Sequence, residues 1–186
     1  SVIYIVLGMH VIVKSGMGNF VNSMRSALSS SLRSASTMSD KPGLEDIGIK
    51  KLGVADPKEV KDEDWKKVLD PKTYAVTRKA DTEAPFTGAY DKFFEKGRYR
   101  CVCCGIELFN SDSKFWAGCG WPAFSNSVDN DLNIKRIVDR SHGMTRTEVR
   151  CKNCDAHLGH VFDDGPQDKG GERYCINSVS MVFEQM

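Results

Sequence analysis

The sequence has almost no net charge and no apolar run long enough to cross a membrane. Lysine and arginine number 26 and aspartate and glutamate 25, which gives a formal net charge of +1. Such a balance creates no strong field to attract nucleic acid or an anionic lipid surface. The apolar start SVIYIVLGMHVIV covers residues 1–13, whereas about 20 apolar residues are needed to span a bilayer. We therefore expect neither nucleic acid nor a membrane as a partner.

Motifs of several common enzyme classes are also absent. There is no glycine-rich phosphate loop, no G-x-S-x-G nucleophile elbow and no internal repeat beyond two short cysteine pairs. The H-x-E and P-C-x-x-C signature of zinc deaminases is missing too, so a zinc hydrolase or deaminase is the least favoured class. With 186 residues, the chain has the length of one domain with extra segments.

The first 39 residues differ in composition from the rest. Residues 1–39 contain no acidic residue, three basic residues and ten serines, which is typical of organelle transit peptides. A mitochondrial or plastid location follows from that interpretation, and a cytoplasmic one otherwise. Because the chain begins with Ser1 rather than Met, the alternative is that this segment is not native and that Met38 is the true start.

Residues 40–55 are rich in glycine and charge without periodicity. This indicates a linker, so we expect ordered structure only after Gly53. Asp56-Pro57 and Asp70-Pro71 each place a capping side chain before a proline suited to the first helical position. We therefore predict two short helices that start there. The first should bury, at least partly, Val60, Trp65, Val68 and Leu69.

The pattern changes beyond Gly97 to short runs that alternate in polarity. RYRCV, RTEVRC and RYCINSVSMVF are such runs, separated by the turn signals CCG, DND, SHGM, DDGP and KGG. An irregular loop at residues 82–90 comes before them. We predict one mainly β domain over residues 56–186, with the short helices at its start.

Four of the seven cysteines form two C-x-x-C pairs. Two such pairs provide four thiolates, which suit tetrahedral Zn²⁺. The 46 residues between the pairs exceed the spacing of a compact finger, so the ion would join two distant β-hairpins as a structural cofactor. The alternative is buried free thiols or disulfides, and Cys103 is interpreted as a bystander. The predicted zinc ligands are Cys101, Cys104, Cys151 and Cys154.

Cys175 stands apart from the pairs, in the strand-like run RYCINSV. Alternation along a strand places Arg173, Cys175 and Asn177 on one face. A nearby guanidinium favours the thiolate, which is the reactive form of cysteine. Asn177 can donate a hydrogen bond to that thiolate or to a bound oxygen. We predict that Cys175 is a redox nucleophile; the alternative is an inert buried thiol, which is common for free cysteines.

Two further segments offer groups that such a nucleophile needs. HLGH places His157 and His160 directly after the second cysteine pair, and either imidazole can donate a proton near neutral pH. The alternatives for one of them are a zinc-ligand role or a purely structural role. GCGWPAF adds Cys119 between two glycines as a resolving thiol, and Trp121 before a proline as an apolar wall.

These motifs resemble the methionine-R-sulfoxide reductases of the B type over residues 82–183. The resemblance rests on TEAPFTGAYD, CVCCGIELF, KFWAGCGWPAF, SHGMTRTEVRCKNCDAHLGHVFDDGP and GERYCINS, which occur in the family's order. It implies two small antiparallel sheets that face each other. Members commonly have KFDSGCGWP where this chain has Trp116 and Ala117, a difference next to Cys119, and the loop before Cys175 is one residue longer than usual.

The resemblance also implies roles for individual residues. Cys175 is the catalytic cysteine, Cys119 the resolving cysteine, and the paired cysteines are the zinc ligands. The residues implied around the substrate sulfoxide are Trp121, His157, His160 and Asn177. We further expect Arg173 to contact the substrate.

The implied reaction is the thiol-dependent reduction of methionine-R-sulfoxide, peptide-bound or free, to methionine. Cys175 becomes a sulfenic acid, Cys119 converts it into a disulfide, and thioredoxin or a similar dithiol reduces that bond. The expected substrates are oxidised proteins, in a repair role, and the expected assembly is a monomer. A zinc-ribbon-like binding module with Cys175 buried is the alternative class.

Overall fold

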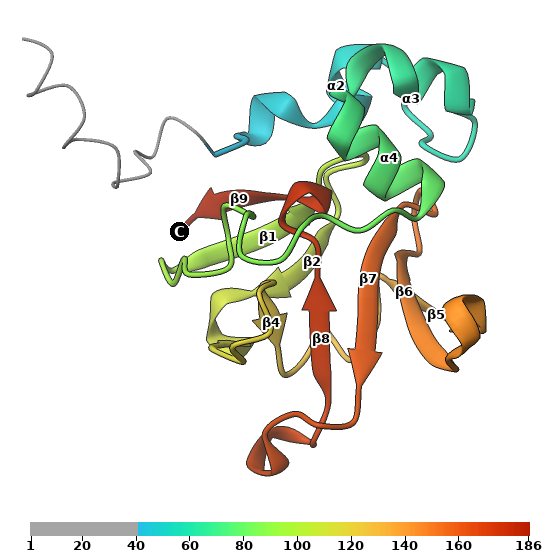
Figure 1. The fold of residues 1–186 in the computed structure, drawn as a ribbon. Helices are drawn as coiled ribbons and strands as arrows, with labels where there is room; N and C mark the ends of the chain where they lie inside the picture. Colours follow the sequence, from blue (N-terminus) through green and yellow to red (C-terminus); the bar gives the residue numbers. More distant parts are fainter. Residues whose placement is uncertain (1–40) are drawn as a thin grey trace, which may run out of the picture. The chain divides into compact units, whose positions relative to one another are not determined.

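The fold is mainly β, with two antiparallel sheets and short helices before them in the chain (Figure 1). The structure is a computed structural model that describes residues 41–186. It confirms the fold class expected from the sequence. The interpretation of residues 1–39 as a targeting or non-native segment falls outside the described residues. Within the described part, no helix has the length and apolar character that a membrane crossing requires.

The smaller sheet has three strands in the order β2-β1-β9, and the larger has six in the order β3-β4-β8-β7-β6-β5. All neighbouring strands are antiparallel. The smaller sheet consists of β1 (Gly97–Cys101), β2 (Glu107–Asn110) and β9 (Met181–Gln185). The larger sheet consists of β3 (Lys114–Phe115), β4 (Ala123–Phe124), β5 (Ile134–Asp139), β6 (Arg146–Cys151), β7 (His157–Phe162) and β8 (Arg173–Ile176).

Helical segments come first in the described part and recur as single turns between strands. The α-helices are α2 (Gly48–Leu52), α3 (Asp62–Val68) and α4 (Pro71–Lys79). The 3-10 turns are η2 (Leu44–Asp46), η3 (Ser111–Ser113), η4 (Ser141–Gly143), η5 (Gln167–Lys169) and η6 (Ser178–Ser180).

Aromatic side chains from both sheets form the core between them. Phe109 of β2 stacks on Phe124 of β4 with ring centroids 4.5 Å apart, and Tyr99 of β1 meets the Phe124 ring at 5.0 Å. Tyr174 of β8 packs edge-on against Phe109 at 5.6 Å. All four side chains are buried. Because Tyr174 faces this core, strand alternation turns its neighbour Cys175 to the other face of the larger sheet.

Both predicted helices are present, but one starts later than expected. Asp70 caps α4 by accepting hydrogen bonds from two backbone nitrogens of its first turn, both at 3.0 Å. Asp56 instead accepts a hydrogen bond from the nitrogen of Lys58 at 2.9 Å. That bond closes a turn, so α3 begins only at Asp62. The apolar side chains expected in this region are buried (Trp65 and Leu69) or half-buried (Val60 and Val68).

Helical turns η2 and α2 lie in the segment that the sequence indicated as a linker. Ile47, between these two turns, is only 2% exposed and belongs to the core. The nitrogens of Gly48 and Ile49 donate hydrogen bonds to the carbonyls of Val102 and Cys103, both at 2.8 Å. Ordered structure therefore begins before Gly53, because this segment is attached to the turn that contains the first cysteine pair.

Candidate active site and metal cluster

The cysteines of the two C-x-x-C pairs come together although they belong to different sheets. Cys101 ends β1 and Cys151 ends β6, and each pair occupies the turn that follows its strand. Cys101 Sγ is 3.6 Å from Cys154 Sγ, and Cys104 Sγ is 3.6 Å from Cys151 Sγ. All four sulfurs lie within 4.8 Å of one another. Four sulfurs at about 2.3 Å from Zn²⁺ stand roughly 3.8 Å apart, so this donor set fits a tetrahedral metal ion.

The metal cluster is closed to further ligands from the described residues. Three of its cysteines are buried and Cys104 is half-buried. No other cysteine, histidine or acidic residue between positions 41 and 186 joins the group, so Cys103 and both histidines of HLGH lie outside it. Four thiolates around one ion leave no position for a substrate. The arrangement suits a structural site rather than a catalytic one.

A second sulfur pair lies on the larger sheet, apart from the metal cluster. Cys175 of β8 stands opposite His160 of β7 in the strand register. Cys119 belongs to the loop between β3 and β4, and its Sγ is 3.6 Å from Cys175 Sγ. Gly118 and Gly120 have φ angles of 68° and 93°, in the left-handed region that favours glycine. The two glycines therefore allow the tight turn that brings Cys119 to the strand.

The hydrogen bond between the two sulfurs couples their ionisation, so that one thiolate disfavours the other. The hydrogen bond with Cys175 lowers the pKa of Cys119 to about 6. The pKa of Cys175 is raised because Cys119 holds its proton in that bond and because burial disfavours a second thiolate. Arg173 opposes the rise at Cys175 through its charge. It does not line the adjacent cavity, and its Nε lies 2.8 Å from Oδ1 of Asp164.

His160 lies across the sheet from Cys175 and is paired with a carboxylate. Its Nε2 is 2.9 Å from Oδ2 of Asp139, the last residue of β5. Asp139 also accepts hydrogen bonds from Nη2 of Arg146 at 2.6 Å and from the nitrogen of Ser141 at 2.8 Å. Hydrogen bonds from Ser141, His160 and Arg146 lower the pKa of Asp139. The sequence analysis missed this carboxylate, since only the pairing of β5, β6 and β7 brings it to His160.

His157 reaches the same face as His160 through a β-bulge. On a regular strand, residues three positions apart point to opposite faces. Here Glu148 of β6 pairs with His160 and Arg150 pairs with His157, so Leu158 is the extra residue on β7. As a result, Nδ1 of His157 lies 2.5 Å from Oε1 of Glu148, and the two imidazole centroids are 5.6 Å apart.

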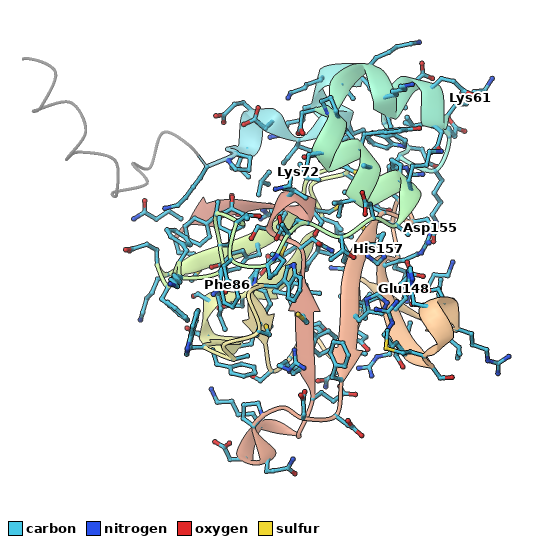
Figure 2. The ribbon with its side chains drawn as sticks, viewed as in Figure 1. Lys61, Lys72, Phe86, Glu148, Asp155 and His157 are labelled. Atoms are coloured by element: carbon cyan, nitrogen blue, oxygen red, sulfur yellow. The ribbon has the colours of Figure 1, made fainter. Side chains whose placement is uncertain are left out.

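His157 lies behind His160 rather than in the cavity. Its side chain is 2% exposed, and it does not line the cavity beside Cys175. Burial lowers the pKa of His157, while the Glu148 carboxylate acts in the opposite direction. Figure 2 labels the side chains of His157 on β7 and Glu148 on β6. Within the described part of the chain, Nε2 of His157 has no hydrogen-bond partner, which suits a neutral ring.

A small cavity of about 100 Å³ opens onto Cys175. Trp121 lines it, and its indole nitrogen donates a hydrogen bond to the carbonyl of Glu83 at 3.0 Å. The side chain of Asn177 accepts from the nitrogen of Glu83 at 3.0 Å and donates to the carbonyl of Leu158, the bulge residue, at 2.9 Å. The lining residues are Thr82, Trp121, Arg146, Gly159, His160, Phe162, Cys175 and Asn177. Trp121, His160, Cys175 and Asn177, which the sequence analysis singled out, thus line the same cavity, and Cys175 is only partly buried.

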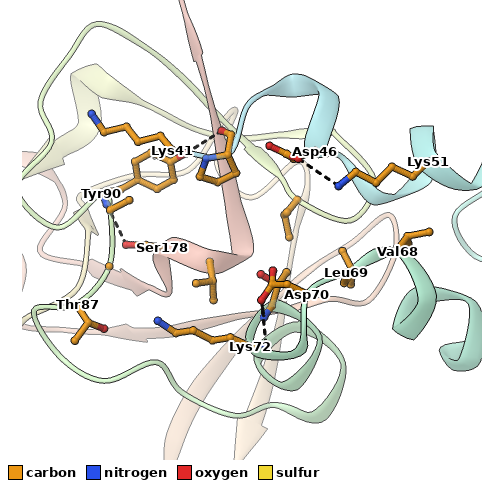
Figure 3. A pocket seen from close by; sticks show the side chains of 16 residues that line it. Lys41, Asp46, Lys51, Val68, Leu69, Asp70, Lys72, Thr87, Tyr90 and Ser178 are labelled. Atoms are coloured by element: carbon orange, nitrogen blue, oxygen red, sulfur yellow. Dashed lines mark hydrogen bonds and ion pairs between the residues drawn. The ribbon is translucent and has the colours of Figure 1, made fainter. Parts of the chain in front are cut away.

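A larger cavity of about 510 Å³ lies beside the start of α4 and the segment 87–90 (Figure 3). Lys41, Lys51 and Lys72 line it, together with Asp46 and Asp70. None of its lining residues is a cysteine or a histidine. The chemical groups therefore favour the small cavity as the candidate active site, although it has less volume.

Two thiols within reach of disulfide formation, beside an imidazole and a cavity, are typical of enzymes that transfer electrons through cysteine. The fold and the site therefore define the class as a thiol-dependent oxidoreductase.

Comparison with known proteins identifies the family. The SelR domain matches residues 69–185. The chain is 66% identical over 143 residues to the probable methionine-R-sulfoxide reductase B of Caenorhabditis elegans, covering 76% of this chain and 94% of that protein. It is 56% identical over 120 residues to the peptide methionine sulfoxide reductase MsrB of Chromohalobacter salexigens, covering 64% and 90%. The chain belongs to the SelR-domain family, the B-type methionine-R-sulfoxide reductases, as the sequence resemblance implied.

Proposed function

We propose that this chain reduces methionine-R-sulfoxide in oxidised proteins to methionine, with Cys175 as the nucleophile and Cys119 as the resolving thiol. The observation that most supports the proposal is the 3.6 Å distance between Cys119 Sγ and Cys175 Sγ, next to the cavity that His160 also lines. The relatives' names support the substrate class, since one specifies methionine-R-sulfoxide and the other methionine sulfoxide in peptides.

The cavity suits the end of a methionine sulfoxide side chain. Trp121, fixed by its hydrogen bond to Glu83, offers an apolar ring face to the methyl group. His160 and Asn177 offer hydrogen-bond donors to the sulfoxide oxygen. A sulfoxide sulfur is chiral, so fixing its methyl group and its oxygen relative to Cys175 selects one epimer, which is R for this family.

In the first step, the Cys175 sulfur attacks the sulfoxide sulfur. The thiol proton passes to the Cys119 thiolate, and the His160 imidazolium protonates the sulfoxide oxygen as the S–O bond breaks. The hydroxyl group is transferred to the Cys175 sulfur as the bond between the two sulfurs breaks, which leaves Cys175 as a sulfenic acid and releases methionine. Cys175 loses the two electrons that the substrate sulfur gains. Asp139, hydrogen-bonded to His160, orients the imidazole and stabilises its charged form.

In the second step, the Cys119 thiol attacks the sulfenic sulfur of Cys175. Water leaves and a disulfide forms, which requires the two sulfurs to close from 3.6 Å to about 2.05 Å. Thioredoxin or a similar dithiol then reduces the disulfide. The charge of Arg173 favours the Cys175 thiolate that is released, so Arg173 serves recycling rather than direct contact with the substrate.

The four-cysteine cluster would hold Zn²⁺ as a structural ion. Bound zinc would join the β1–β2 turn to the β6–β7 turn and thereby connect the two sheets. Strand β7 begins three residues after Cys154 and contains both histidines. The metal cluster therefore helps to position His160 without entering the reaction.

The proposal is tested by a single-turnover assay on reduced, zinc-loaded protein with the separate R and S epimers of a methionine sulfoxide peptide. We expect about one methionine per chain from the R epimer, none from the S epimer, and the loss of two thiols. Formation of methionine from neither epimer would rule out the proposed reaction.

Two variants, measured in the same assay, show which cysteine is the nucleophile and which is the resolving thiol. Cys175→Ser should form no methionine. Cys119→Ser should still form one methionine per chain from the R epimer but lose only one thiol, and thioredoxin should recycle it slowly. Normal recycling of Cys119→Ser would show that another group resolves the sulfenic acid.

A further inference from the structure

Two aromatic side chains are exposed to solvent beside the loop that contains Cys119. Trp116 is 50% exposed and Phe86 is 61% exposed. Trp116 lies three residues before Cys119, and Phe86 belongs to the loop before β1 that Figure 2 shows. The catalytic steps proposed above use neither side chain. We refer to Trp116 and Phe86 together as the aromatic surface.

Each residue of the aromatic surface lies next to one of the two glycines that flank Cys119. Nε1 of Trp116 lies 4.0 Å from the position that a Cβ would occupy on Gly118. The nitrogen of Phe86 donates a hydrogen bond to the carbonyl of Gly120 at 2.7 Å, and its Cε2 lies 3.2 Å from the Cβ position of Gly120. The two rings thus border the turn on which the half-buried Cys119 sits.

A cation accompanies the exposed rings. Nζ of Lys92 lies 5.7 Å from the Trp116 ring centroid, and Lys92 is itself exposed. No carboxylate is within 4.0 Å of Lys92 among the ion pairs of the described residues. Exposed aromatic side chains are enriched in protein-binding surfaces, and the charge of Lys92 adds a group that a partner's carboxylate can pair with.

We propose that the aromatic surface is the docking site for the dithiol protein that reduces the Cys119–Cys175 disulfide. This inference rests on the proposed function, which makes Cys119 the sulfur that an external dithiol must reach. The partner that fits has a C-x-x-C dithiol within a flat apolar surface, with a carboxylate at its edge to meet Lys92. The substrate, in contrast, must enter the cavity lined by Trp121 and His160.

The exchange that docking would promote is balanced in electrons and protons. The partner's thiolate attacks Cys119 Sγ, and the Cys175 thiolate leaves, with Arg173 stabilising its charge. The partner's second thiol then attacks the mixed disulfide, which releases Cys119 and leaves the partner oxidised. The two thiol protons of the partner end on Cys119 and Cys175. Attack at Cys119 is expected because its loop borders the aromatic surface, whereas Cys175 lines the cavity that the substrate occupies.

The test compares reduction by a protein with reduction by a small dithiol. Enzyme oxidised to the Cys119–Cys175 disulfide is mixed with reduced thioredoxin or with dithiothreitol, and both second-order rate constants are measured. The variants are Trp116→Asp, which introduces the residue common in the family and therefore should fold, and the double variant Trp116→Ala/Phe86→Ala. We expect the thioredoxin rate constant to fall about tenfold or more, as for buried aromatic contacts of interfaces, and the dithiothreitol rate constant to change less than about twofold.

The matched control replaces exposed apolar residues elsewhere, as Leu132→Ala/Val138→Ala, which are 53% and 63% exposed; it should leave both rate constants unchanged. An unchanged thioredoxin rate constant in the aromatic variants would overturn the docking site. Slower reduction of an oxidised protein substrate, with thioredoxin unaffected, would overturn it too and assign the surface to substrates. The single-turnover yield of the aromatic variants tests the proposed function separately, because a peptide substrate does not need this surface.

Discussion

Nε2 of His160 on β7 is hydrogen-bonded to Oδ2 of Asp139 on β5 over 2.9 Å, across the intervening strand β6. Arg146 donates a hydrogen bond to the same oxygen, and the backbone nitrogen of Ser141 donates one to Oδ1. Nε2 of the His160 imidazole is thus hydrogen-bonded within the protein, and the other ring nitrogen is left for the substrate. Asp139 therefore acts as a positioning residue for the proposed proton donor.

Replacement of this carboxylate tests that role. Asp139→Asn should slow the single-turnover rate by about tenfold to a hundredfold, because a neutral amide no longer stabilises the imidazolium that donates the proton. The ¹⁵N chemical shifts of the His160 ring should change as well, which a purely structural effect would not produce. Asp168→Asn, at an exposed position in η5, is the control. Unchanged rate and unchanged ring shifts in Asp139→Asn would argue against the positioning role.

The shared ionisation of the thiol pair predicts a pH dependence. Because the pKa of Cys119 is lowered to about 6, its thiolate is present above that pH and is lost as the pH falls below it. Iodoacetamide should therefore alkylate Cys119 with a half-maximal rate near pH 6. In Cys175→Ala, the hydrogen-bond donor is removed and the half-maximal pH should move up toward that of an ordinary thiol. Mass spectrometry of the alkylated peptide gives the measurement, and identical profiles for both proteins would contradict the coupling.

Loss of one metal ligand should unfold the domain. Structural zinc sites contribute about 10 to 16 kcal/mol, which equals or exceeds the roughly 5 to 15 kcal/mol by which domains are stable. Cys104→Ser should therefore bind little zinc and lose its cooperative thermal transition, measured by metal analysis and near-UV circular dichroism. Cys103→Ala is the matched control from the same turn, outside the sulfur cluster, and should retain one zinc per chain. The reverse ranking of these two variants would reassign the ligands.

Because residues 44–52 pack on the core, a mutation in this segment should lower the free energy of unfolding. Ile47→Ala should lower the free energy of unfolding by about 2 to 5 kcal/mol, because it removes a buried aliphatic side chain. Val54→Ala, at a position 39% exposed, should change it by less than about 0.5 kcal/mol. Urea unfolding measures both variants. Equal stability of the two would mean that residues 44–52 do not contribute to the core.

Local patterns predicted the features that depend on neighbouring residues. Alternation in RYCINSV correctly separated Tyr174 in the core from Cys175 on the other face, and the C-x-x-C spacing predicted a cluster that the four sulfurs form. The Asp70-Pro71 signal located the start of α4. The Asp56-Pro57 pattern gave a helix start that is too early, because an aspartate side chain can also close a simple turn.

Features that depend on distant contacts were missed. Asp139 and Glu148 are ordinary acidic residues in the sequence, and they become partners of the two histidines only through the pairing of β5 and β6 with β7. Ile47 lies in a segment too short for helical periodicity, and its burial depends on the turn near residue 103. Tertiary contacts, rather than local propensity, decide such positions.

Because β7 contains an extra residue, the number of residues in HLGH affects the site as much as their identity does. Leu158 shifts the strand by one position, and its carbonyl accepts hydrogen bonds from both the backbone nitrogen and the side-chain amide of Asn177. A natural homologue with one residue deleted here could keep every functional side chain and still form a regular sheet. In such a sheet His157 would lie two positions from His160 and keep its face, but the extra carbonyl that accepts both hydrogen bonds from Asn177 would be gone. Insertions and deletions within HLGH are therefore expected to be more damaging to this enzyme than most substitutions of its apolar residues.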